Sequence, residues 1–282
     1  MDEPTLYARR FGAPGSDGSL VFLNATGLNA SCYTPLLQSV AFDGEILAMS
    51  LRGHGASTLA ADPKALKSWH IFARDVEQFL AQQELAGPIT IAGHSAGAVT
   101  ALLTANRIGA MRVAMIEPVV IPSFAVWLAR SPLKSVTIDK NPLAAAASKR
   151  RAHFDSLRHV EESYRKKRFF AGWNEEAFAG YLDEGFRPTG DGEGITLACA
   201  PAYEAACFGA QASGFWPHLT TARRRGAQCI IASSERQSTF PKHKHQRAEA
   251  LGARVTILKG GHMLPVEDPV RAAKWLEHAL RV

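Results

Sequence analysis

The pentapeptide at residues 93–97, Gly-His-Ser-Ala-Gly, has the residue types and spacing of a nucleophilic site. It follows the strand-like run of residues 89–92 and precedes a helix-competent run. This pattern is typical of a sharp strand-to-helix turn that lifts one serine clear of a sheet, and glycine avoids Cβ clashes in such a crowded turn. We therefore predict that Ser95 is a nucleophile. The amide of Ala96, at the start of the following helix, is predicted to be free to bind an oxyanion.

A serine nucleophile needs a base and a group that orients the base. Among the ten histidines we favour His262, in the segment Gly-Gly-His-Met-Leu-Pro-Val-Glu-Asp-Pro at residues 260–269. This segment follows the last predicted strand and leads into a helix that starts with proline. A loop at the carboxyl end of a strand can reach Ser95 across a sheet, so His262 is the predicted base.

The surrounding sequence alternates between extended and helical patterns, which predicts an α/β protein with a mainly parallel sheet covered on both faces. The expected strands are residues 5–10, 20–24, 45–50, 89–92, 112–117, 228–232 and 254–258. Residues 121–210 break this rhythm with helices and loops. We therefore predict a core of residues 1–120 and 211–282, with a helical cap at 121–210 placed over the carboxyl ends of the strands.

Three segments together, residues 51–57 (Leu-Arg-Gly-His-Gly-Ala-Ser), 93–97 and 261–269, resemble the α/β-hydrolase fold, in particular serine esterase- or lipase-like members with a helical cap. The resemblance covers nearly the whole chain. It implies the chain order serine, acid, histidine, and it implies a structural role for His54. One departure is Ser50, because an aspartate commonly occupies that position in the family.

The acid has two candidates. The family usually carries it after the strand that corresponds to residues 228–232, where Glu235 is available but is displaced by about one residue from the expected position. Some members, including haloalkane dehalogenases, place it at the end of the strand that follows the elbow helix, which here is Glu117. A carboxylate that closes an apolar strand needs a partner if it is buried, and His262 is a natural one. We favour Glu117 and keep Glu235 as the alternative.

The second oxyanion donor is expected in the loop at residues 24–29, Asn-Ala-Thr-Gly-Leu-Asn, where position assigns it to the amide of Thr26. Asn24 replaces the histidine that is usual in the family, and it is either a turn-forming residue or a substrate contact. Residues 121–220 hold 14 of the 24 aromatic residues. The candidates for substrate contacts in this region are Trp127, Trp173 and Trp216.

These observations predict a serine hydrolase that cleaves a carboxylic ester or thioester with an apolar acyl or aromatic group, without a metal or organic cofactor. Two alternatives remain open. The same triad could hydrolyse a C–C bond or a lactone, or carry out a cofactor-free haloperoxidase-like reaction. The chain could also be a non-catalytic receptor for a small ligand.

Charge and composition limit the partners. The net charge is +6, and residues 221–282 hold 12 basic and 5 acidic side chains. Without interleaved aromatic residues this excess predicts a solvated helix face rather than a nucleic-acid site. The four cysteines have no zinc-like spacing and are expected to be reduced thiols. Residues 1–10 lack a secretory signal pattern, and no apolar run is long enough to span a membrane, so we expect a cytoplasmic protein. The sequence does not indicate an oligomeric state.

Overall fold

A seven-stranded sheet forms the centre of the computed structural model, which describes residues 3–121, 141–190, 192–210 and 214–282. The strand order is β1-β3-β2-β4-β5-β9-β10, and only β1 runs antiparallel to its neighbour in this described sheet. The expected mainly parallel sheet is therefore confirmed. The strands are β1 (Tyr7–Phe11), β2 (Gly18–Leu23), β3 (Gly44–Ser50), β4 (Ile89–His94), β5 (Arg112–Ile116), β9 (Gln228–Ser234) and β10 (Arg254–Leu258).

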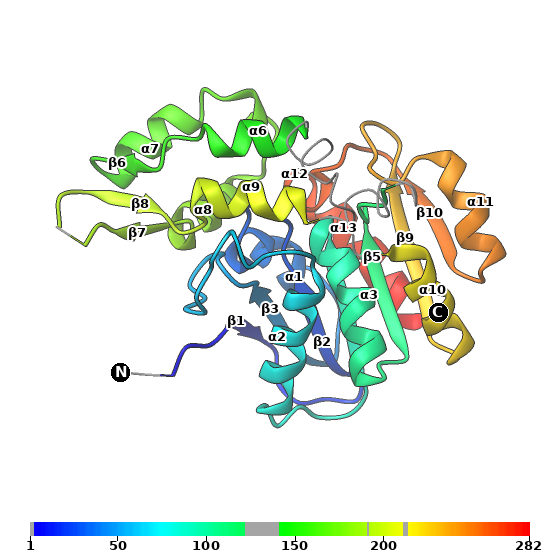
Figure 1. Ribbon diagram of the computed structural model, residues 1–282. Helices are drawn as coiled ribbons and strands as arrows, with labels where there is room; N and C mark the ends of the chain where they lie inside the picture. Colours follow the sequence, from blue (N-terminus) through cyan, green and yellow to red (C-terminus); the bar gives the residue numbers. More distant parts are fainter. Residues whose placement is uncertain (1–2, 122–140, 191, 211–213) are drawn as a thin grey trace.

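Helices cover both faces of this sheet (Figure 1). One face packs against α2, α3 and α10, and the other packs against α1 and α13. The helices and turns around the sheet are η1 (Ala30–Tyr33), α1 (Thr34–Gln38), α2 (His70–Ala81), α3 (Ala96–Ile108), α10 (Phe215–Arg224), α11 (Lys242–Ala250), α12 (Leu264–Glu267) and α13 (Pro269–Arg281). Two layers of helices thus bury both faces of the strands, as expected for parallel strands joined by helical crossovers.

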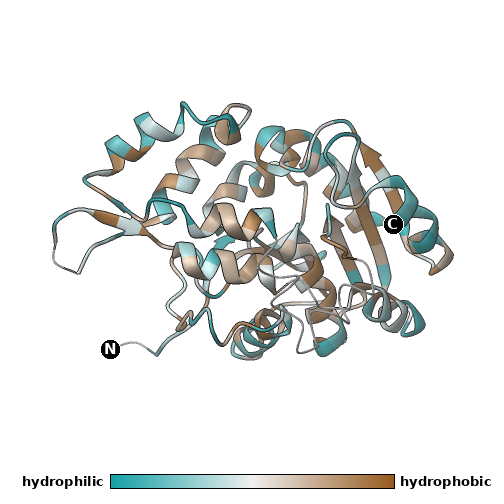
Figure 2. Cartoon of the chain, turned by 45° about the horizontal axis from the view of Figure 1, so that its top comes forward, coloured by the Kyte–Doolittle hydropathy of each residue, from teal (hydrophilic) through white to brown (hydrophobic). Residues whose placement is uncertain are grey.

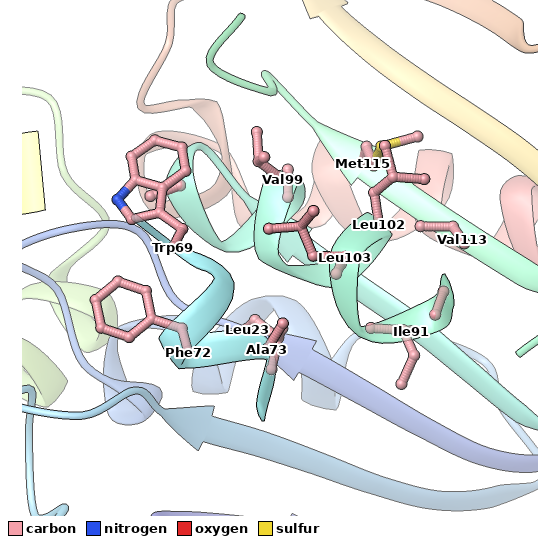
Figure 3. Packing of buried hydrophobic residues seen from close by; sticks show 14 of the residues in the cluster. Leu23, Trp69, Phe72, Ala73, Ile91, Val99, Leu102, Leu103, Val113 and Met115 are labelled. Atoms are coloured by element: carbon pink, nitrogen blue, oxygen red, sulfur yellow. The ribbon is translucent and has the colours of Figure 1, made fainter. Parts of the chain in front are cut away.

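Side-chain alternation divides the core into two parts. In β2, Val21 and Leu23 belong to the cluster beneath α2 and α3, whereas Leu20 and Phe22 belong to the cluster on the opposite face. This follows from the two-residue period of a strand. Figure 3 shows Val99 and other side chains of α3 packed between the strands and α2. Figure 2 shows hydrophobic segments along the central strands and mixed segments on the surrounding helices.

A second layer of chain between β5 and α10 lies over the core (Figure 1, green to yellow). Its described elements include a three-stranded antiparallel sheet with the order β6-β8-β7. The sequence predicts helices and loops in this region. Strands of two or three residues show no alternation in a sequence, which explains the difference. The elements are α6 (Pro142–Ser148), β6 (His153–Phe154), α7 (Leu157–Tyr164), η3 (Arg168–Phe170), α8 (Glu175–Glu184), β7 (Phe186–Pro188), β8 (Ile195–Leu197) and α9 (Pro201–Gly209).

Part of the C-terminal basic excess serves internal structure. The guanidinium of Arg225 donates to the carbonyls of Ala105 and Ala110 at 2.9 and 3.1 Å, and it thereby caps the end of α3. Arg247 lies over the ring of Trp216, with 4.3 Å between the guanidinium carbon and the ring centroid. Arg225 is therefore committed to the core, whereas Arg247 is exposed and also covers an aromatic ring.

All four cysteines are buried, and all four are free thiols. Burial raises the pKa of Cys229 to about 11, and it also raises the pKa values of Cys32, Cys199 and Cys207 well above their ordinary value. Within the described residues, no helix has the length and hydrophobicity needed to cross a bilayer.

Candidate active site

The turn between β4 and α3 holds Ser95 in a strained conformation, with φ 57° and ψ −115°. Its amide donates to the carbonyl of Ile116 at 2.9 Å, which fixes the turn against β5. A Cβ on Gly93 would lie 2.5 Å from the backbone of Gly97, and a Cβ on Gly97 would collide with the carbonyl of Leu23. Both glycines are therefore required by close backbone approach, which explains the Gly-x-Ser-x-Gly spacing.

Ser95, His262 and Glu117 form one continuous line of polar contacts. The imidazole Nε2 of His262 lies 3.1 Å from Ser95 Oγ, and its Nδ1 lies 3.2 Å from Glu117 Oε2. The side chain of His262 is 23% exposed, whereas that of Glu117 is fully buried. Each nitrogen of the ring thus faces the partner that a general base requires.

The carboxylate of Glu117 is surrounded by donors. It accepts hydrogen bonds from the amide of Thr239 at 2.7 Å, from the hydroxyl of Ser238 at 2.8 Å and from the amide of Ser234. Burial alone would raise the pKa of Glu117, but the hydrogen bonds from His262 and from these three residues outweigh it and lower the pKa to about 2. The site therefore holds a permanent negative charge beside the imidazole.

The backbone of Glu117 is also unusual, because its φ of 52° lies in the left-handed region. Its amide donates to the carbonyl of Ala232 at 2.8 Å, and its carbonyl accepts from the hydroxyl of Thr239 at 2.8 Å. Non-glycine residues in this region are strained and persist where the surroundings fix them. Here β9 and the loop after it fix the turn that aims the carboxylate at His262.

The alternative acid lies elsewhere. Glu235 is exposed, and its amide pairs with the carbonyl of Leu258 at 2.8 Å. The structure therefore brings Glu117, and not Glu235, to His262. The loop that contains Glu235 instead supplies the donors Ser234, Ser238 and Thr239. Sequence reasoning missed these donors, although the hydroxyl-rich run at residues 233–239 was a signal.

The two predicted oxyanion donors lie on adjacent segments. The amide of Ala96 is at the first position of α3, where an N–H has no intrahelical acceptor. The amide of Thr26 makes no hydrogen bond within the described part of the chain. A Cβ on Gly97 would also lie 2.5 Å from the carbonyl of Asn24, so the elbow and the Thr26 loop are in close contact.

Asn24 is fully buried. Its side-chain N–H groups donate to the carbonyls of Ala25 and Leu28 at 2.8 and 2.6 Å, and its oxygen accepts from the amide of Leu51 at 2.8 Å. The side-chain amide is thus committed to the local turn and to the segment after β3. This placement fits the turn-forming interpretation of Asn24 and leaves no free group for a substrate.

The three tryptophans considered as substrate contacts have different positions. Trp127 lies outside the described residues. Trp173 is buried against Phe170 and Tyr181, with ring centroids 5.0 and 5.8 Å away. Trp216 is also buried and belongs to the core cluster beneath α3. The last two tryptophans therefore have clear packing roles.

The arrangement can carry out nucleophilic acyl transfer. Ser95 Oγ is adjacent to an imidazole, and a carboxylate orients that imidazole. In the described residues, no three His, Cys, Asp or Glu side chains are grouped so that they could hold a metal ion.

Several solved proteins have the same fold. The crystal structure of E-2-(acetamidomethylene)succinate hydrolase superimposes with a TM-score of 0.73 at 17% identity, covering 98% of this chain and 100% of that chain. The peroxisomal alpha-beta-hydrolase Lpx1 from Saccharomyces cerevisiae gives 0.74 at 18% identity, with 97% and 80% covered. The thioesterase domain from the curacin biosynthetic pathway gives 0.72 at 14% identity, with 99% of each chain covered.

At these identities the likeness shows the fold alone, and no curated protein matches the sequence. The model of the alpha/beta hydrolase family matches residues 20–275, which is most of the chain. Together with the sheet, the elbow and the similar solved structures, this match shows that the chain is a hydrolase that belongs to the alpha/beta hydrolase family.

Proposed function

We propose that the protein is a serine hydrolase that cleaves a carboxylic ester or thioester through an acyl-enzyme. The observation that carries this proposal is the contact of His262 Nε2 with Ser95 Oγ at 3.1 Å, on a ring whose other nitrogen faces a buried carboxylate. A neutral imidazole in this position can take the serine proton as the Oγ attacks.

The proposed sequence has two halves. In the first, Ser95 Oγ attacks the carbonyl carbon, its proton passes to His262, and the amides of Ala96 and Thr26 bind the oxyanion. The tetrahedral intermediate collapses, and His262 protonates the leaving alcohol or thiol. In the second half, His262 removes a proton from water as the water oxygen attacks the acyl carbon. The second tetrahedral intermediate then collapses, His262 returns the proton to Ser95 Oγ, and the acid is released. Glu117 stays ionised throughout and stabilises the imidazolium.

The proposed substrate has an apolar acyl or aromatic group. The support is the exposed ring of Phe169, which packs on the buried rings of Phe170 and Trp173 with centroids 4.9 and 5.6 Å away. The amide of Asn174 donates to the carbonyl of Val266 at 2.8 Å, so this cluster is joined to the segment that follows His262. An apolar surface at that position suits the part of a substrate that does not react.

The test is intact-mass analysis after incubation with a fluorophosphonate, together with hydrolysis of a panel of aryl esters, acyl thioesters and lactones. We expect one adduct on the wild type, no adduct on Ser95→Ala, and a fall in hydrolysis of about 10⁴-fold or more in that variant. A folded wild-type protein that forms no adduct would contradict the proposal and favour a ligand receptor. An adduct together with turnover of lactones but not of open-chain esters would show that the protein is a lactone hydrolase and not an esterase.

A further inference from the structure

Two buried side chains, Tyr33 and His94, connect the segments of the site without touching the reacting atoms. The amide of Ala25 donates to Tyr33 Oη at 3.0 Å, and Tyr33 Oη lies 2.9 Å from His94 Nδ1. His94 Nε2 in turn lies 2.8 Å from the carbonyl oxygen of His262. Both side chains are fully inaccessible to solvent. Three contacts thus join the oxyanion loop, the elbow and the base.

The direction of each hydrogen bond follows from the chemistry of the groups. Burial, together with the nearby His262, lowers the pKa of His94 to about 3, so its ring is neutral and carries one N–H. The carbonyl of His262 can only accept, so that N–H is on Nε2. Nδ1 then accepts from the hydroxyl of Tyr33, whose oxygen accepts from the amide of Ala25. Every donor along this path has an acceptor.

The residues that Tyr33 and His94 join are adjacent in sequence to the proposed reacting groups. Ala25 directly precedes Thr26, and His94 directly precedes Ser95. The third partner is the backbone of His262 itself. The His94 and His262 rings are 5.0 Å apart between centroids, yet the hydrogen bond goes to the carbonyl of His262 and leaves its imidazole free for Ser95 and Glu117.

We propose that Tyr33 and His94 are positioning residues that hold the oxyanion loop and the loop of the base at a fixed distance from the nucleophile. The inference rests on the proposed hydrolase function. It assigns these residues no proton transfer. A displacement of a catalytic group by about 1 Å can lower the rate about 100-fold. A small shift of either loop should therefore reduce turnover without changing how tightly the substrate binds.

The main test compares Tyr33→Phe with Tyr203→Phe. Tyr203 is a matched control because it is buried and its hydroxyl has no hydrogen-bond partner within the described residues. We expect Tyr33→Phe to lower kcat and the rate of fluorophosphonate labelling by about 10- to 100-fold with KM within about threefold. We expect Tyr203→Phe to change each value by less than about twofold.

A second pair of variants keeps the proposal falsifiable if Tyr33→Phe does not fold. His94→Gln retains an N–H near the position of Nε2, whereas His94→Leu removes it. One hydrogen bond of about 1.4 kcal/mol corresponds to about tenfold, so kcat should be about tenfold higher in the Gln variant than in the Leu variant. Equal kcat values in folded samples of both would overturn the proposal.

These experiments distinguish failure of the hydrolase proposal from failure of the positioning role. If the wild type forms no adduct, the hydrolase proposal fails and the positioning role fails with it. If the wild type is labelled and Tyr33→Phe reacts as fast as Tyr203→Phe, only the positioning role is overturned. A loss of thermal stability in Tyr33→Phe at unchanged kcat would show a purely structural role and would likewise overturn it.

Discussion

The surroundings of Glu117 and the loop of Thr26 differ in how many of their hydrogen-bond donors are already paired. On the acid side, the carboxylate of Glu117 is fully buried and meets the hydroxyl of Ser238, the amides of Ser234 and Thr239, and His262. On the oxyanion side, the amide of Thr26 lacks an acceptor within the described residues. The carboxylate of Glu117 is therefore fully hydrogen-bonded at rest, whereas the proposed oxyanion donor at Thr26 is unused within the described residues.

In the proposed reaction this difference separates a permanent charge, on Glu117, from a transient one, on the oxyanion. A permanent anion in a protein interior must be fully hydrogen-bonded, because an unsatisfied one costs several kcal/mol. Donors for a transient oxyanion are useful only if the ground state leaves them unused, since binding that is equal in ground and transition states does not raise kcat. The predictions below test this contrast, starting with the largest effect.

The largest effect is expected for Glu117→Gln. The N–H₂ group of the glutamine would face one of the two backbone N–H donors, that of Ser234 or that of Thr239, and the charge that stabilises the imidazolium would be lost. We expect kcat to fall by about 10³- to 10⁴-fold and the free energy of unfolding to fall by about 1–3 kcal/mol. Steady-state kinetics and urea unfolding measure both. Wild-type kcat in a folded Glu117→Gln sample would show that the acid side is not needed.

The second prediction concerns acid unfolding. The pKa of Glu117 is about 2 in the folded protein, below its ordinary value of 4.5. Between these values the unfolded chain binds more protons, so the free energy of unfolding falls as the pH falls. The stabilisation is fully present above about pH 4.5 and is on the order of 3 kcal/mol.

Urea unfolding of the wild type and of Glu117→Gln, measured from pH 7 to pH 3, tests this expectation. The difference in unfolding free energy between the two proteins should shrink as the pH falls below about 4.5. A constant difference over the whole range would mean that Glu117 is not held as a buried anion.

The third prediction concerns the oxyanion side. Asn24→Ala leaves the amide of Leu51 and the carbonyl of Leu28 without their partner, so we expect unfolding to become easier by about 1–3 kcal/mol. Because the Thr26 loop would loosen, kcat should fall by about tenfold with KM little changed. A large rise in KM at full stability would instead identify Asn24 as a substrate contact.

The smallest effect is expected for Glu235→Gln. Glu235 is exposed, and its amide, not its side chain, pairs with β10 through Leu258. Kinetic constants should stay within about twofold and the free energy of unfolding within about 0.5 kcal/mol. This variant is the charge-matched control for Glu117→Gln, and a loss of activity comparable to that of Glu117→Gln would return Glu235 to the triad.

The sequence predicted the parts of this protein that depend on local patterns. The mainly parallel sheet followed from alternating extended and helical runs. Ser95 followed from its flanking glycines, because a tight turn limits residue types within two positions. His262 and Glu117 could be proposed because each lies where a predicted strand ends, and the ends of parallel strands meet at one edge of a sheet.

The contacts that complete the site could not be predicted in the same way. Ser238 and Thr239 reach Glu117 across 121 and 122 residues of sequence, and Tyr33 reaches His94 across 61. Such pairings depend on the register of β5 against β9 and on where a loop folds back, neither of which has a period along the chain. The role of Asn24 stayed open for the same reason, since one of its partners is Leu51.

Because the four cysteines are buried, their reaction with a thiol reagent can report unfolding of the protein. Thiol reagents attack the thiolate, and here every thiol is buried with a raised pKa. A chromogenic disulfide added to the native protein should therefore be consumed only as fast as the chain opens, with up to four equivalents released per molecule. The variants above could thus be ranked by opening rate in the same cuvette, without a denaturant.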